Sequence, residues 1–278
     1  MADHPNFGDL LTRLLQHRRI DVAGLSSASG IPEGELRAVV GGTPPSSRQL
    51  DALAPALGFH PEDLYVIAGG PVPEDRTPRD PAAGSATVSL IKITTALPPD
   101  QRARVHRLVD GLRPEPRVGP QEPLRAYDPE RGGFGALLVN LLCGNRLGNS
   151  VPSAAKALAL LTHGRVYLAA STVNGIGQGR VPLTADLVTG FAVTLGMQPG
   201  DLAALTGVEL PEPPRPADPL TEEMAGLLWD CRRLTAEQAE HACEAASSLL
   251  VAVPEDAPEE DWNRVHRHHG TWWGAPRR

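Results

Sequence analysis

The sequence has few aromatic residues and no excess of positive charge. Phe, Trp and Tyr make up 4% of the 278 residues, so a core must be built mainly from Leu, Ala and Val. This composition favours packed helices over sheets, which prefer β-branched and aromatic residues. The net charge of −7 argues against a protein that binds nucleic acid through a general positive charge, and it leaves room only for a local basic patch.

Several kinds of site are missing as well. Cys143, Cys231 and Cys243 form no close C-x-x-C pair, so we expect reduced thiols; a zinc site built from the last two and nearby histidines is the alternative. The sequence has no Walker loop, nucleophile elbow, zincin helix or paired-carboxylate motif, so we expect no enzyme, cofactor or metal. Apolar runs are too short for a membrane span, and residues 1–10 do not resemble a signal peptide. We therefore expect a cytoplasmic protein.

The chain carries three motifs twice, in the same order. They are FGDLLTRLLQHRR (7–19) and FGALLVNLLCGNR (134–146), LGFHPEDLYVIAG (57–69) and LGMQPGDLAALTG (195–207), and, more loosely, LPPDQRARVHRLVDGL (97–112) and LTAEQAEHACEAASSL (234–249). The offset is 127 at the first motif and 138 at the second. A tandem duplication explains the repeat. The change of offset predicts about ten extra residues between the first and third helices of the second copy.

Clusters of proline divide the chain, because proline cannot continue a helix. The sequence predicts an all-α fold with front domains at 1–70 and 131–210, linkers at 71–86, 114–130 and 211–219, a short helical segment at 87–113, a helical pair at 220–253, and a tail at 254–278. The tail mixes arginine and histidine with tryptophan. It is either a flexible terminus or a segment that binds phosphate or a partner.

The first front domain has the pattern of five short helices. An apolar stripe from Phe7 to Leu15 predicts the first of them. Asp21 is placed to cap the second helix, and Gly30 supplies the tight turn that follows it. Pro32 is expected at the first position of the third helix, where its missing N–H costs little.

This pattern resembles the phage-repressor/Cro (Xre) class of helix-turn-helix proteins, here as an actinobacterial-type regulator. The residues that carry the resemblance are Leu25, Ala28, Gly30, Ile31, Leu36, Val39, Gly42, Leu50, Leu57 and Gly58. In the second copy, residues 171–176 (STVNGI), followed by Gly179 and Arg180, resemble the recognition helix of the family. The resemblance implies two helix-turn-helix domains in tandem, each placing its third helix in the major groove of DNA.

The resemblance places the base-reading positions of the first domain at Glu33, Gly34 and Ala38, with Arg37 beside them. Carboxylates at this helix start suit the helix dipole but repel phosphates. Residues 7–70 hold seven acidic and five basic residues. We therefore expect the first domain to contribute little to DNA binding and to have a scaffolding or protein-contact role.

The second domain is better suited to DNA. Residues 134–210 hold three acidic and four basic residues, and the hydroxyl and amide groups at its third helix can bond phosphates or base edges. The candidate DNA-binding residues are Arg165, Tyr167, Ser171, Thr172, Asn174, Gln178 and Arg180. The alternative is that these side chains only solvate an exposed helix face.

The sequence thus predicts a sequence-specific regulator of transcription that binds double-stranded DNA mainly through its second front domain. The alternative is a protein-interaction or small-ligand-sensing protein that keeps the fold without binding DNA. No effector is specified by the residues. Because the linkers are long and rich in proline, we do not expect a rigid pair of domains within the chain. If the protein binds a palindrome, we expect instead a homodimer in which the second front domain pairs with its counterpart in another chain, helped by the amphipathic helices of 220–253.

Overall fold

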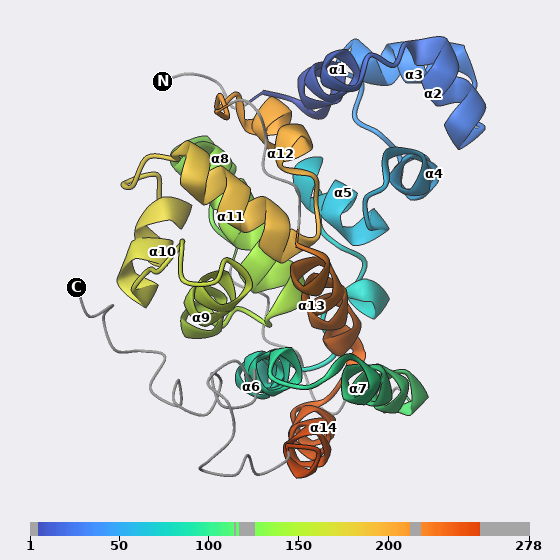
Figure 1. The fold of residues 1–278 in the computed structure, drawn as a ribbon. Coiled ribbons are helices and arrows are strands. Elements are labelled where there is room, and N and C mark those ends of the chain that lie inside the picture. Colours follow the sequence, from blue (N-terminus) through green and yellow to red (C-terminus); the bar gives the residue numbers. More distant parts are fainter. Residues whose placement is uncertain (1–4, 114, 117–125, 212–217, 251–278) are drawn as a thin grey trace.

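The computed structural model describes residues 5–113, 115–116, 126–211 and 218–250. Within these ranges the chain is helical and forms no strand, which confirms the all-α expectation (Figure 1). The tail from residue 254, with its histidines and tryptophans, lies outside the described residues. So do most of the expected linkers at 114–130 and 211–219.

Five helices form the first unit: α1 (Phe7–Arg18), α2 (Val22–Ser29), α3 (Glu33–Val40), α4 (Ser47–Leu57) and α5 (Pro61–Ile67). Local sequence signals set their ends. Asp21 caps α2 by accepting a hydrogen bond from the Gly24 backbone N–H at 2.7 Å, and Gly30 ends α2 with φ of 71°. Pro32 precedes α3 as its N-cap instead of occupying its first position.

Five further helices form the second unit in the same order: α8 (Pro129–Val139), continued by the π turn η3 (Asn140–Gly144), α9 (Val151–Leu161), α10 (Ala170–Gly177), α11 (Ala185–Leu195) and α12 (Pro199–Thr206). The two units differ between their first and third helices. Helix α9 has 11 residues against 8 in α2, and the segment 162–169 is longer than its counterpart 30–32. The extra residues of the second unit therefore lie where the sequence offset indicated.

A helical pair follows each unit: α6 (Gly84–Thr95) with α7 (Pro99–Gly111), and α13 (Pro219–Asp230) with α14 (Ala236–Ser248), the last two being joined by the short turn η4 (Cys231–Arg233). The pairs pack on each other, with α14 along α6 and α7 (Figure 1). Helices α6 and α13 also contact α9, so the four helices are fixed to the second unit.

Residues 71–83 are not the extended linker that their prolines predicted. They form two short turns, η1 (Glu74–Arg76) and η2 (Pro81–Ala83), which hydrogen bonds hold against the rest of the chain. The Arg79 N–H donates to the Arg232 carbonyl at 2.7 Å, and the Asp80 carboxylate accepts from the Ala236 N–H at 2.8 Å. Proline tolerates such short turns because their first N–H groups have no helical partner.

The repeated Phe-Gly at the start of each unit has a packing role. A Cβ atom on Gly8 would lie 2.4 Å from the Val39 carbonyl oxygen of α3, and one on Gly135 would lie 2.2 Å from the Ile176 carbonyl oxygen of α10. Both distances are far below van der Waals contact. In each unit, therefore, the first helix approaches the end of the third helix as closely as only glycine permits. The motif fixes the position of α3 and α10.

Replacing Gly135 by alanine should force α8 and α10 apart. We expect Gly135→Ala to lower the free energy of unfolding by about 1–3 kcal/mol, the usual cost of overpacking. Gly34→Ala is the matched control, because a Cβ at this glycine of α3 meets no atom within 4 Å. It should stabilise the protein by about 0.5–1 kcal/mol. Urea unfolding measures both changes, and equal effects would contradict the close contact.

Candidate nucleic-acid interface

The exposed face of α3 carries charges that are already paired. Arg37 forms an ion pair with Glu33 one turn earlier, and the Gln49 side chain donates to the Glu35 carboxylate at 3.0 Å. Gly34 and Ala38 are exposed on the same face. The expected positions therefore lie together on one surface, where the Glu33 carboxylate partly cancels the Arg37 guanidinium.

The candidate residues of α10 follow helical spacing along one face. Ser171 and Gln178 are exposed, Thr172 and Asn174 are half-buried, and Tyr167 precedes the helix with 59% of its surface exposed. The opposite face, with Val173 and Ile176, is fully buried. The structure thus brings the expected polar residues together on the outside of the second unit.

Three arginines lie at the two ends of α10. Arg165 precedes the helix, where its Nε donates to the Thr162 carbonyl at 3.2 Å, and Arg180 follows the helix and donates to the Gln178 side chain. Sequence reasoning missed Arg131, whose side chain is 88% exposed and forms an ion pair with Asp128, with Nε 3.5 Å from the carboxylate. A Cβ on Gly179 would lie 2.9 Å from the Arg131 carbonyl oxygen, so Arg131 stands beside the end of α10. We refer to Arg165 and Arg180 as the basic strip.

Asn174 is a fixed side chain. Its amide oxygen accepts a hydrogen bond from the hydroxyl of the buried Tyr127, and the Tyr127 ring also fills the space beside Gly177. The backbone of Tyr127 is held in turn by the Asn140 side chain, with two hydrogen bonds of 2.8 Å. Asn174 therefore contributes to the position of α10. Sequence reasoning missed this contact because Tyr127 lies within the expected linker 114–130.

Residues 11–68 match the family model of the Cro/C1-type helix-turn-helix DNA-binding domain. The first unit is similar to helix-turn-helix domains of this type, and we refer to it as the helix-turn-helix domain. In it, α2 and α3 are the two helices of the motif, with Gly30 in the turn between them. The match covers less than a quarter of the chain and does not extend to the second unit. No curated protein and no solved structure matched the chain.

The helix-turn-helix domain is joined to the second unit by a buried ion pair. Arg146, at the end of the π turn, donates to both oxygens of Asp63 on α5 at 2.7 and 2.8 Å. Both side chains are at most 1% exposed. The Asn145 side chain donates to the same carboxylate at 2.7 Å. These contacts contradict the expectation that long linkers leave the two domains without a rigid arrangement, because the linkers set only the path of the chain and do not prevent direct packing.

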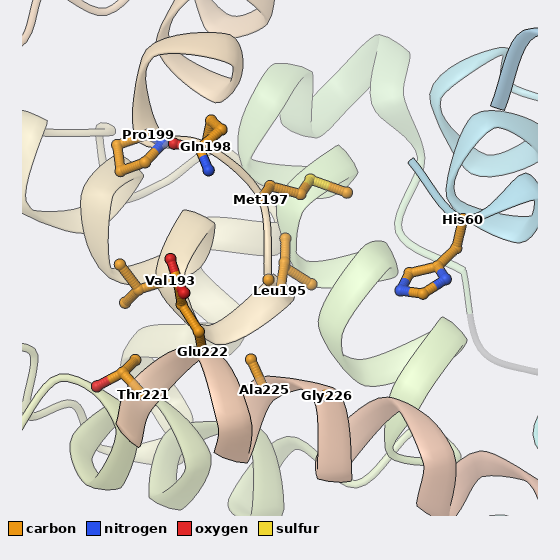
Figure 2. A pocket seen from close by; sticks show the side chains of 11 residues that line it. His60, Val193, Leu195, Met197, Gln198, Pro199, Thr221, Glu222, Ala225 and Gly226 are labelled. Atoms are coloured by element: carbon orange, nitrogen blue, oxygen red, sulfur yellow. The ribbon is translucent and has the colours of Figure 1, made fainter. Parts of the chain in front are cut away.

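A pocket of about 360 Å³ opens beside this junction (Figure 2). Leu195 and Met197 line it at the corner between α11 and α12, Thr221 and Ala225 line it on α13, and His60 of the helix-turn-helix domain closes one side. The walls mix apolar and polar groups, and they come from both units and from α13.

His60 stacks on Trp229 of α13, with ring centroids 3.5 Å apart and planes 9° apart. The guanidinium groups of Arg232 and Arg146 lie over the same indole, at 4.0 and 5.0 Å from its centre. Burial lowers the pKa of His60 to about 4; Asp63 opposes this shift and the two arginines add to it. At neutral pH the imidazole is therefore uncharged between the two units.

Neither a metal-binding cluster nor a membrane-spanning helix is found within the described ranges, and two of the cysteines are buried. No cluster of three or more His, Cys, Asp or Glu side chains is arranged to hold a metal ion. Burial raises the pKa of the Cys143 and Cys231 thiols to about 12, so both stay protonated at neutral pH. None of the described helices combines the length and apolar character that a membrane crossing requires.

The neutral state of His60 makes stability depend on pH. Below pH 6.5 the unfolded chain takes up a proton that the folded chain binds only near pH 4, so stability should fall as the pH drops through this window. Gln198 is the residue that matches His60 in the repeated motif. The variant His60→Gln should therefore lose less stability between pH 7.5 and pH 5 than the native chain does. Urea unfolding at pH 7.5 and pH 5 measures it. His241→Gln, at an exposed position of α14, is the control, and an unchanged pH dependence in His60→Gln would contradict the assignment.

Proposed function

We propose that this protein is a sequence-specific transcription regulator that binds double-stranded DNA, and that its second unit is a second helix-turn-helix domain that does most of the reading. The Cro/C1-type domain at residues 11–68 supports DNA binding. The order of helices in the second unit and the equivalent glycine contacts at Gly8 and Gly135 support a duplication of that domain.

The proposal that the second unit makes most of the DNA contacts rests on the charges around the third helix of each unit. Around α10, the guanidinium groups of Arg165 and Arg180 are exposed at the two ends, where the phosphates of a bound duplex would pass. Between them, Ser171, Thr172 and Gln178 offer hydroxyl and amide groups to base edges. On α3, by contrast, the Glu33 carboxylate faces the same surface as Arg37 and opposes a phosphate.

A small-ligand-sensing role is a second candidate, and the junction pocket favours it. The pocket joins residues of both units with α13, so a bound molecule would bias how these parts pack. The carboxylate of Glu222 lies at the pocket, as Figure 2 shows, and His60 is neutral there. Under this proposal the pocket binds an effector and the basic strip binds DNA, so the two roles are compatible.

Selection from a pool of random DNA duplexes tests the proposal. The full chain should enrich a defined sequence, and Arg165→Ala with Arg180→Ala should weaken binding to it at least tenfold. Because each lost phosphate contact reduces the salt dependence of log K by about 0.9, the double variant should show a slope smaller by about 2. Fluorescence anisotropy over a range of salt concentrations measures both.

Two further variants make the result specific. Arg104→Ala with Arg107→Ala removes two exposed charges of α7, away from α10, and should leave affinity unchanged. Arg37→Ala should weaken binding less than the loss of Arg165 and Arg180. Equal losses from both helices would reject the asymmetry, and a pool without any enriched sequence would reject the regulator.

A further inference from the structure

The two units contact each other at two places, and both contacts join the first helix of one unit to the fifth helix of the other. Arg18 at the end of α1 donates to the Asp201 carboxylate of α12, with Nε at 2.8 Å from Oδ1. Arg146 at the end of the α8–η3 helix donates to the Asp63 carboxylate of α5. In each case the end of the first helix of one unit binds the fifth helix of the other, and α12 lies beside α1 in Figure 1.

The two carboxylates occupy one position of the repeated motif. Asp63 belongs to LGFHPEDL and Asp201 to LGMQPGDL, and both follow the proline by two residues. Both are buried although aspartate rarely is. A chance contact between two domains would have no reason to use the same residue of each copy.

The arginines match once the π turn is taken into account. In the aligned motifs Arg146 corresponds to Arg19, one residue after Arg18. A π turn contains about one residue more than a turn of α-helix. After η3, each residue therefore takes the place around the helix that the preceding residue would have in a regular α-helix. Arg146 then stands where Arg18 stands in α1, and Asn145 stands where His17 stands.

The neighbours of the arginines confirm this register. The Asn145 side chain donates to Asp63 at 2.7 Å, and the His17 ring lies 3.9 Å from Asp201. Each carboxylate therefore faces two consecutive residues from the other unit. A contact in which residue i meets j and residue j meets i is the signature of a two-fold, isologous interface.

We infer that the two units form an internal pair with approximate two-fold symmetry, so that one chain does alone what two chains of a helix-turn-helix dimer do together. The surface that would receive a second copy of the unit is occupied by the other half of the same chain. This replaces the expected pairing of the second front domain with its counterpart in another chain. The helices of 220–253, expected to help that pairing, pack on α6 and α7.

A consequence for DNA rests on the proposed function. If DNA is read by both units, the two-fold pair must present α3 and α10 to one duplex as half-sites about one helical turn apart. Because the α3 surface is less suited to DNA, the site should contain one strong and one weak half. One chain should then occupy one duplex.

The two contacts differ in burial, which makes one of them suitable for mutation. The Arg146–Asp63 pair is enclosed, and the guanidinium groups of Arg146 and Arg232 both lie over the Trp229 ring. The Arg18 side chain is 22% exposed and Asp201 5%. Variants of the Arg18–Asp201 pair therefore disturb the interface without removing the enclosed pair.

Light scattering and a charge exchange test the inference. The free chain should have the mass of one copy, 29.5 kDa, and should bind the selected duplex one to one. Arg18→Asp and Asp201→Arg should each lower the midpoint of thermal unfolding by at least about 3 °C, and the double exchange should recover at least half of the summed loss. Arg104→Asp, an exposed reversal on α7, is the control and should change nothing.

Three results would overturn the inference. They are a mass of twice 29.5 kDa for the free chain, two chains bound to one duplex, and a double variant whose loss of thermal stability equals the sum of the two single losses. If the pool yields no enriched duplex, the proposed function fails, while the mass of the free chain and the charge exchange still decide whether the internal pair exists. If the free chain is a dimer that binds DNA, the internal pair fails and the proposed function stands.

Discussion

The ion pair between Arg146 and Asp63 determines how the halves of this protein are arranged. Taking both charges out of water is costly, and the geometry offsets this cost with a bidentate contact and further hydrogen bonds from Arg146 to the Leu141 and Leu195 carbonyls. Removing either partner would leave an unpaired buried charge, which commonly costs about 3–5 kcal/mol. The pair therefore selects one arrangement of the two units, and the stacked His60 and Trp229 close it from the side of α13.

The surface around α10 depends on the same framework. Glycine contacts hold α10 against α8, and α8 continues through the π turn into Arg146, so one helix carries both the support of α10 and the contact to the helix-turn-helix domain. Leu195 of α11 and His60 line the junction pocket. Helix α11 contacts η3, which continues α8, and α8 contacts α10. Under the proposed function, a molecule bound in this pocket would act on α10 through the packing between the units.

Local rules predicted much of the fold, because caps and turns depend on neighbouring residues. Asp21 caps the start of α2 and Gly30 ends it, as the sequence indicated, and Ser171 and Gln178 of α10 are exposed. The contacts that join the units could not be predicted in this way. Arg146 and Asp63 are 83 residues apart, and the one-residue shift made by the π turn hides the match between Arg146 and Arg18 in an ungapped comparison. The role of Asn174 was hidden for the same reason, since Tyr127 lies 47 residues away.

The central claim is that the two units have one fixed arrangement, and a distance between them tests it most directly. Spin labels at Ala38→Cys on α3 and Ser171→Cys on α10 would report that distance by pulsed electron resonance, with Cys243, the least buried of the three native cysteines, replaced by serine. The account predicts a single narrow distance distribution in the free chain at neutral pH. A broad distribution would show that the units move independently and would contradict it.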